Sequence, residues 1–356
     1  MLHPIKPAAE VELRNVIAFQ RKVLEFACLP TLNFDRAKVD AYFGIQANWF
    51  WTHTSLHSLV KGLGSEIDSI NDPNIGIFIL AAFDNDVGFD KRIDDPTFAF
   101  ACCELDIRIR SLVTALLKAF YDLLENGYSE EITGTRKIDR ETVAQAFWSL
   151  NSQLKVCPYC DGPRPDKINE KVRSQCDHHF PKSKHPSLSV HPMNLVPTCL
   201  DCNLTDKGNK DATDKAHISE LFLPYADGRA VFGPLKVSAF RYAGELTVKF
   251  DDNGNPRTSR IESLNHLLKL QDRWIDRLKN RVSGSIVNSL RNQCRSAKRR
   301  NEIDSDILEN LGYQKDGCFD SRGKEHDSIL KETYFDFLIN DSSERKDVFS
   351  NFGIAI

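Results

Sequence analysis

Four cysteines form two C-x-x-C pairs in one polar segment of the chain, residues 157–211. The first pair is Cys157 and Cys160, and the second is Cys199 and Cys202. Each pair has the spacing of a zinc knuckle, a turn that directs two thiolates at one ion, and four thiolates suit a tetrahedral structural Zn²⁺. In a reducing compartment, paired cysteines bind metal more often than they form disulfides. The pattern therefore predicts one structural zinc site.

Residues with the chemistry of phosphodiester hydrolysis lie between and just after these cysteines. This reaction needs a base that takes a proton from water and a cation that neutralises charge on the phosphate. A neutral histidine suits the first task, because its unperturbed pKa is about 6.5, and His178 is the candidate base. Mg²⁺ prefers carboxylate, amide and water oxygens. We therefore expect Asp177 and Asn203 to hold one catalytic Mg²⁺ or Mn²⁺.

A longer pattern encloses these candidates. Asp-His-His-Phe-Pro-Lys-Ser occupies residues 177–183, Asn-Leu-Val-Pro occupies residues 194–197, and Asn203 directly follows the last cysteine. Together with the cysteine pairs, this order resembles the HNH nucleases, the ββα-metal or His-Me finger class. The zinc-bearing members, including phage junction-resolving endonucleases, resemble it most. The resemblance implies that Asn194 braces the loop between two strands and helps to position the base.

The resemblance also predicts two strands followed by a helix. Adjacent residues of a regular strand point to opposite faces. Asp177 and His178 must both approach one phosphate, so we expect them at a twisted strand end. The second strand is predicted over residues 194–198. The helix is predicted to run from near Cys199 to about Gly208, with Asn203 on its first or second turn.

Neighbouring residues leave one alternative open. In some colicin-type relatives, two adjacent histidines are metal ligand and base, which would make His178 the ligand and His179 the base. The position of Pro181, three residues after His178, favours His178 as the base. Lys182 and Lys207 lie near these residues in the sequence, so we expect them to contact phosphate.

Other polar residues of the segment have simpler interpretations. His185 and His191 lie in the loop between the predicted strands, where we expect them to be exposed to solvent. Cys176 precedes the first candidate metal ligand. We expect it to be a buried thiol and not a fifth zinc ligand.

The composition excludes several classes of protein. Of the 356 residues, 41% are hydrophobic and 27% charged, which excludes a wholly disordered chain and a disulfide-stapled mini-protein. The net charge of −3 excludes a uniformly basic nucleic-acid binder but permits a locally basic face. No stretch reaches about 18 consecutive apolar residues, and the N-terminal sequence lacks the apolar run of a signal peptide. We therefore expect a cytoplasmic protein without membrane contact.

The hydrophobic pattern indicates a mainly α fold with a small α+β insert. Residues 1–150 are predicted to be a helical domain of unknown role. Residues 151–215 are predicted to be the HNH nuclease cassette, a ββα-metal unit on the four-cysteine zinc site. Residues 216–356 are predicted to be a C-terminal region of a hairpin and helices with DNA or partner contacts.

Individual elements follow from apolar spacing and turn signals. Residues 75–84 fit either a buried strand or a short core helix, and residues 236–252 alternate as a hairpin does. The predicted helices cover residues 11–29, 35–63, 97–126, 140–150, 258–300 and 330–339.

Arginine and lysine are concentrated in residues 273–300. A basic helical face can neutralise backbone phosphates without reading sequence. Arg273 and Arg277 are therefore candidate nucleic-acid contacts, and the alternative is a solvated helix face. Trp274, at helical spacing from Leu278, is expected in the core.

These features predict a metal-dependent endonuclease that hydrolyses phosphodiester bonds of DNA. The cassette resembles those of bacterial HNH proteins associated with anti-phage defence and mobile elements, which implies a role in antiviral defence and an ATPase or other defence-system partner. The chain has no recognisable helix-turn-helix or second zinc module, so cleavage would be non-specific, structure-specific or directed by a partner. The alternatives are a zinc-stabilised nucleic-acid- or protein-binding module without catalysis, a restriction- or homing-type nuclease and an RNA-cleaving nuclease. An oligomer is compatible with the sequence.

Overall fold

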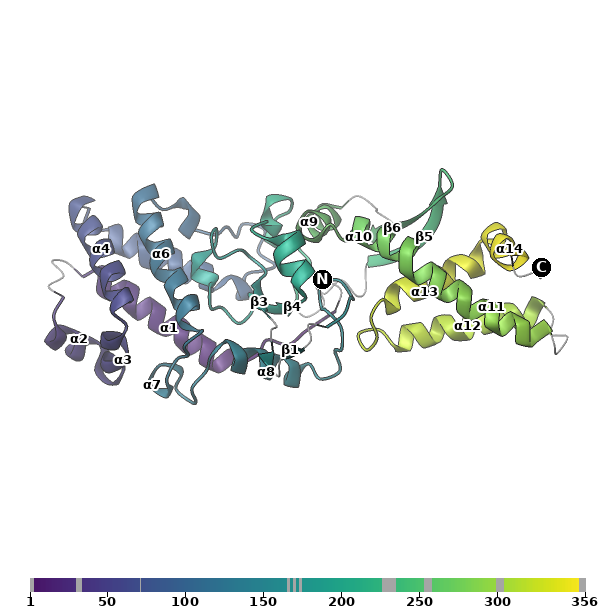
Figure 1. Cartoon of the computed structure of the whole chain (residues 1–356). Coiled ribbons are helices and arrows are strands. Elements are labelled where there is room, and N and C mark those ends of the chain that lie inside the picture. The colour runs from purple at the N-terminus through teal and green to yellow at the C-terminus, as the bar shows by residue number, and fades with distance from the viewer. Residues whose placement is uncertain are drawn as a thin grey trace.

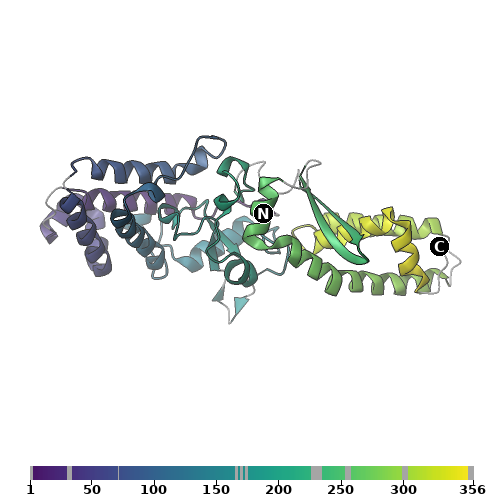
Figure 2. The same ribbon diagram turned by 90° about the horizontal axis from the view of Figure 1, so that it is seen from above.

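The computed structural model describes residues 3–29, 34–70, 72–164, 167–168, 171–172, 175–225, 235–252, 258–298 and 304–351. The molecule is elongated, with the N-terminal helices at one end and the C-terminal helices at the other (Figure 1, Figure 2). In the part of the chain that the structure describes, no helix combines the length and apolar character needed to cross a bilayer.

Helices make up the N-terminal region, as the sequence predicted. They are α1 (Glu10–Ala27), α2 (Arg36–Phe43), α3 (Ala47–Thr52), α4 (Thr54–Ile70), α5 (Ile75–Val87), α6 (Ile107–Leu123), α7 (Glu130–Thr133) and α8 (Arg140–Leu150). Helix α1 packs against α4, α5 and α7, and its Leu13, Val16 and Val23 are fully buried. Helix α8 begins with a capping box at Asp139, which accepts the backbone N–H of Thr142 at 2.8 Å.

Three N-terminal predictions needed the structure to decide or correct them. The single helix predicted over residues 35–63 is divided into α2, α3 and α4, so that prediction was wrong. Residues 75–84, for which a strand and a helix were both open, belong to helix α5. The helix predicted over residues 97–126 begins only at Ile107, so the prediction was wrong at its start. The buried carboxylate of Asp86 accepts the backbone N–H of Ala101 at 2.6 Å. This contact holds the backbone before α6 in a turn.

The strands described by the structure form three separate antiparallel pairs. These are β1 (Lys167–Ile168) with β2 (Lys171–Val172), β3 (Gln175–His178) with β4 (Leu195–Thr198), and β5 (Leu235–Tyr242) with β6 (Glu245–Asp252). In the second pair, His178 lies opposite Leu195 and Asp177 lies opposite Val196. The third pair is the hairpin predicted over residues 236–252.

The loop between β3 and β4 is buried, so the expectation that its histidines are exposed was wrong. His185 is 5% exposed and His191 is fully buried. His185 Nε2 lies 2.5 Å from Asp211 Oδ2. Ser187 Oγ donates to the buried carboxylate of Asp86 at 3.0 Å. The loop is therefore fastened both to helix α5 and to the segment that follows the second cysteine pair.

Helices also dominate the C-terminal region. They are α9 (Ser259–Leu268), α10 (Leu270–Arg277), α11 (Ser283–Lys298), α12 (Asp304–Asp320), α13 (Ser328–Asn340) and α14 (Ser342–Ser350). The helix predicted over residues 258–300 is interrupted at Lys269, whose φ of 45° is left-handed. Beyond α10 the chain continues through a wide helical turn, η8 (Leu278–Val282), into α11. Trp274 of α10 is fully buried, as expected.

Two hydrophobic cores meet at the β3–β4 pair. The N-terminal core includes Cys176, buried as expected, and Leu195 of β4. The second core joins Val196 of β4 and Phe180 to the C-terminal helices. Successive residues of a strand point to opposite faces, so Leu195 and Val196 pack in different cores. The strand pair is thereby held from both sides.

The buried His191 predicts a specific loss of stability in acid. Burial lowers the pKa of His191 to about 4, with Asp90 raising it and Arg14 lowering it. The unfolded chain then binds the extra proton, so the free energy of unfolding falls as the pH drops below about 6.5. Asparagine does not titrate, so the free energy of unfolding of His191→Asn should fall less between pH 7.5 and pH 5 than that of the native chain. We expect the difference between the two decreases to be about 2 kcal/mol.

Denaturant unfolding of both proteins at the two pH values measures this difference. The four cysteines are the same in both chains, so any loss of metal from them in acid cancels in the comparison. Equal pH dependence of the two proteins would contradict the prediction.

Candidate functional site

The four cysteines of the two C-x-x-C pairs come together, as the sequence predicted. Their Sγ atoms all lie within 4.8 Å of one another. The separation is 3.9 Å between Cys157 and Cys202 and 3.8 Å between Cys160 and Cys199. A sulfur tetrahedron with Zn–S bonds of about 2.3 Å has edges of about 3.8 Å. The donor set and its spacing therefore fit one zinc ion.

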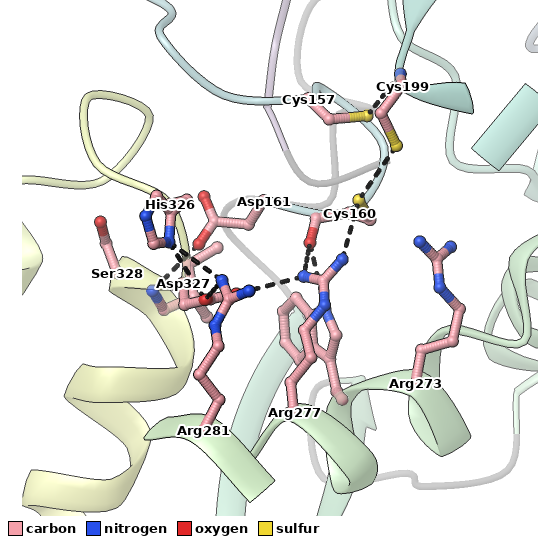
Figure 3. Close-up of polar contacts among 12 residues, drawn as sticks. Cys157, Cys160, Asp161, Cys199, Arg273, Arg277, Arg281, His326, Asp327 and Ser328 are labelled. Carbon is pink, nitrogen blue, oxygen red and sulfur yellow. Dashed lines mark hydrogen bonds and ion pairs between the residues drawn. The ribbon is translucent and has the colours of Figure 1, made fainter. Parts of the chain in front are cut away.

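Helix α10 places two arginines against the cysteine cluster. Arg273 Nη1 donates to Cys202 Sγ, and Arg277 Nη2 donates to Cys160 Sγ, each at 3.3 Å. Both side chains are only 15% exposed, and Figure 3 shows Arg277 turned toward Cys160. The two guanidinium groups offset thiolate charge. Contrary to the prediction from the basic run, they do not face solvent where nucleic acid would lie.

Asp161 ties the first cysteine knuckle to distant segments of the chain. It is buried and has a left-handed φ of 56°. Its carboxylate contacts His3 Nε2 at 2.8 Å and accepts the backbone N–H of Ile329 at 3.2 Å. Its carbonyl accepts the N–H of Asp327 at 2.8 Å, and the Asp327 carboxylate in turn accepts from Arg281 (Figure 3). This network holds the start of helix α13 against the knuckle.

Strands β3 and β4 are followed by a short helix, η5 (Asp201–Lys207), in the order that the sequence predicted. The helix is wider than an α-helix, because the N–H of Gly208 donates to the carbonyl of Asn203 five residues earlier, at 3.1 Å. Asn203 lies half-buried on this helix. The far end of the helix reaches β3 through Lys207.

Asp177, the first candidate metal ligand, is paired with Lys207. Lys207 Nζ lies 3.2 Å from Asp177 Oδ1, and both side chains are buried. Burial raises the pKa of Asp177 to about 6, although the Lys207 charge opposes that change. Asp177 Oδ2 is buried and has no hydrogen-bond partner among the described residues. Lys207 thus neutralises a metal-ligand candidate and does not face solvent, where it was expected to contact phosphate.

His178, the candidate base, lies on the other face of β3. Its Nε2 is 2.8 Å from the carbonyl of Ser189. A carbonyl only accepts hydrogen bonds, so Nε2 carries the proton. Burial lowers the pKa of His178 to about 3, although the hydrogen bond to Ser189 opposes that change. The ring is therefore a neutral imidazole whose Nδ1 is unprotonated.

Asn194 has the bracing contacts that the resemblance implied. Its fully buried side chain accepts the N–H of Phe180 at 2.7 Å and donates to the carbonyls of Phe180 at 3.0 Å and Leu188 at 2.9 Å. These bonds fix the start and the middle of the loop that leaves β3. Asn194 thereby holds the backbone next to His178 and Ser189.

His179, the alternative base, is turned away from His178 and its surroundings. Its Nδ1 lies 3.3 Å from the hydroxyl of Tyr159, in the first cysteine knuckle. The ring also packs edge-on against Phe180, and only 2% of the residue is exposed. These contacts favour a packing role for His179, and the choice between His178 and His179 as the base stays a prediction.

Two residues near His178, Tyr121 and Arg140, were not predicted from the sequence. The ring of Tyr121, on α6, packs edge-on against the His178 ring at 4.4 Å between centroids. Arg140 lies over the same tyrosine, as does Lys182, whose Nζ is 4.2 Å from the ring centroid. An aromatic residue at an apolar position of a helix is expected in the hydrophobic core. An arginine next to a helix cap is expected on the surface, so neither residue type indicates a functional site. Only the packing of α6 on β3 reveals them.

Comparisons with known proteins give one partial likeness. No protein-family model matches the chain, and no solved structure matches it. The chain is 34% identical over 91 residues to "Protein ea31" of Escherichia phage lambda. The aligned segment is 25% of this chain and spans 28% of the phage protein. A likeness of this extent relates one part of the two proteins.

The arginines of α10 are expected to stabilise zinc binding. We expect Arg277→Gln to weaken zinc retention about tenfold or more, because neighbours of metal ligands typically change metal affinity by about 10- to 100-fold. The measurement is the rate of zinc release to a chromogenic chelator. Lys279→Gln is the matched control, since Lys279 pairs with the exposed Glu245 at 2.5 Å. Equal release rates in all three proteins would show that Arg277 contributes nothing to the site.

Proposed function

We propose that this chain is a metal-dependent HNH endonuclease that hydrolyses phosphodiester bonds of DNA. The observation that carries the proposal is the state of His178, a neutral imidazole with an unprotonated Nδ1, at the end of the strand that carries the candidate ligand Asp177 on its other face. A general base must be unprotonated and held in one orientation. The carbonyl of Ser189 supports both requirements.

His178 would take a proton from the attacking water through Nδ1. A base with a pKa of about 3 is too weak for this task at neutral pH. A bound phosphodiester brings negative charge beside the ring, and nearby negative charge raises the pKa of a histidine. Substrate binding is therefore expected to make His178 a stronger base.

Asp177 and Asn203 would hold the catalytic Mg²⁺ or Mn²⁺. The buried Asp177 Oδ2, which has no partner among the described residues, fits a cation ligand. When bound, such an ion supplies positive charge to the phosphate oxygens. Lys207 neutralises Asp177 in the present arrangement, so it would have to release that carboxylate. Asn194 would position His178 by holding the loop that carries Ser189.

The burial of the candidate residues favours a second function, a zinc-stabilised binding module without catalysis. Asp177 is 5% exposed and His178 is 7% exposed. A module of this kind needs the cysteine frame but neither a free Asp177 oxygen nor an unprotonated His178 nitrogen. The two functions therefore differ in their response to divalent metal and to His178→Ala.

A role in defence against phage, beside an ATPase or another defence-system partner, belongs to the same proposal. It rests on the likeness of the cassette to those of anti-phage HNH proteins. The partial identity with a protein of phage lambda is an observation that connects this chain with phages.

Metal binding at Asp177 is testable without any substrate. We expect Mn²⁺ at about 100 times its Kd to raise the melting temperature of the zinc-loaded chain by about 4 °C. Asp177→Asn should abolish this rise. Asp214→Asn, which removes an exposed carboxylate paired with Lys184 at 2.8 Å, should keep it. Differential scanning fluorimetry measures the shift, and an undiminished rise in Asp177→Asn would remove Asp177 from the ligand set.

Cleavage itself tests the proposed function. The native chain, with Mg²⁺ or Mn²⁺, should cut supercoiled plasmid or linear duplex DNA. His178→Ala should slow cutting by at least about 100-fold, the usual contribution of a general base. His53→Ala, a half-buried histidine on the N-terminal helices, is the control and should cut normally. Single-stranded DNA and RNA in parallel reactions identify the substrate class.

Absence of cutting by the folded, zinc-loaded native chain on all four substrates would favour the binding module. A repeat with a candidate partner protein would show whether the partner is required for cutting. Equal cutting by His178→Ala would assign the base to another residue.

A further inference from the structure

The ring of Tyr121 lies beside His178 and contacts several charged side chains. It lies on α6, in the N-terminal region, and its hydroxyl donates to the carbonyl of Cys176 on β3 at 3.0 Å. One side of the tyrosine contacts the His178 ring. The N-terminal helices are thus part of the immediate surroundings of the candidate base.

Two cations lie over the same ring. The guanidinium carbon of Arg140 is 4.4 Å from the Tyr121 centroid, and Lys182 Nζ is 4.2 Å from it. Arg140 is the first residue of α8, and Lys182 lies in the loop after β3. Stacking on an aromatic ring fixes the direction of each cation. Both side chains keep an exposed part, 35% for Arg140 and 29% for Lys182.

The carboxylates that accompany these cations are loosely held. Arg140 lies 3.8 Å from Asp122 and 3.5 Å from Glu125, and Lys182 lies 3.4 Å from Asp122. Asp122 and Glu125 are 66% and 71% exposed, so solvent screens these pairs and each contributes little. Arg140 Nε is buried and has no hydrogen-bond partner among the described residues. Arg140 Nη2 also donates to the backbone carbonyl of Tyr121 at 3.2 Å. The ring and this carbonyl therefore orient the cations, and their exposed parts are available to a stronger anion.

We propose that Arg140 and Lys182, stacked on Tyr121, form a clamp that binds the phosphate backbone of DNA next to His178. This inference rests on the proposed function and adds the substrate-binding residues to it. A guanidinium and an ammonium both bind phosphate oxygens. The Tyr121 ring is already covered by the cations and by His178, so bases have no stacking surface there, and the clamp contacts the backbone without reading sequence.

The clamp gives residues 1–150 a role in the site. Arg273 and Arg277, the first two arginines of the basic run, are directed at the cysteine cluster. Backbone contacts beside His178 come instead from α8 and from the loop after β3. The N-terminal helices would therefore be required for DNA binding and not only for packing.

The test is DNA binding without cleavage. Fluorescence anisotropy with a labelled duplex of arbitrary sequence, in zinc-loaded protein without added Mg²⁺ or Mn²⁺, gives the Kd. We expect Arg140→Gln and Lys182→Gln each to weaken binding about tenfold. Each should also lower the slope of log K against log salt by about one unit, as the loss of one phosphate contact does.

Two further variants separate the clamp from a structural role. Arg140→Lys keeps the charge and should keep the native slope of log K against log salt, while its Kd weakens because an ammonium does not stack as a guanidinium does. Arg36→Gln is the matched control, because Arg36 also stacks on an aromatic ring, Trp51, and pairs with an exposed carboxylate, Asp40 at 2.7 Å. It belongs to α2, at the far end of the N-terminal helices from β3 (Figure 1). Its Kd should not change.

The outcomes distinguish the clamp from the nuclease. Native-like binding by Arg140→Gln and Lys182→Gln would overturn the clamp, whatever the cleavage result. Weakened binding by both variants, with no cleavage by the native chain even after a candidate partner is added, would support the clamp and reject the nuclease. Failure of the native chain to bind duplex DNA would overturn both, even where it bound RNA.

Discussion

The clustering of four cysteine sulfurs, close enough to hold one metal ion, is the constraint on which the rest of the structure depends. Four thiolates around one divalent ion leave a net charge of about −2, and a buried charge without a partner is strongly destabilising. Arg273 and Arg277 offset it, so helix α10 must lie against both knuckles. That contact places the C-terminal helices. The second knuckle also begins helix η5 and so determines where Asn203 and Lys207 lie.

The candidate site is completed from outside its own segment of the chain. Leu195 and Val196 of β4 point into two different cores, so neither core can shift without moving the strand pair. Tyr121 of the N-terminal helices covers the ring of His178, while Ser189 fixes its tautomer. The orientation of one histidine thus depends on the packing of α6, β3 and the buried loop between β3 and β4.

Residue spacing in the sequence predicted the parts of the structure that depend on residues close together in the chain. The cysteine spacing predicted the thiolate cluster, the alternation in residues 236–252 predicted the β5–β6 hairpin, and the role of Asn194 agrees with its bonds to Phe180. Burial of His185 and His191, and the inward direction of Arg273 and Arg277, depend on partners far away in the sequence. Composition gives no information on such partners, so the expectations that these two histidines are exposed and that these two arginines face solvent were wrong.

The assembly of one site from three regions bears on how such a segment is inherited. A recombination event that moved only residues 151–215 into another chain would carry every residue of the cysteine and histidine pattern. It would leave behind Tyr121, which orients the histidine's surroundings, and Arg273, which offsets the thiolates. Successful exchange would therefore have to include α6 and α10, or occur between chains that already share both. Relatives recognised by the pattern alone would include chains in which the motif survives and the site does not.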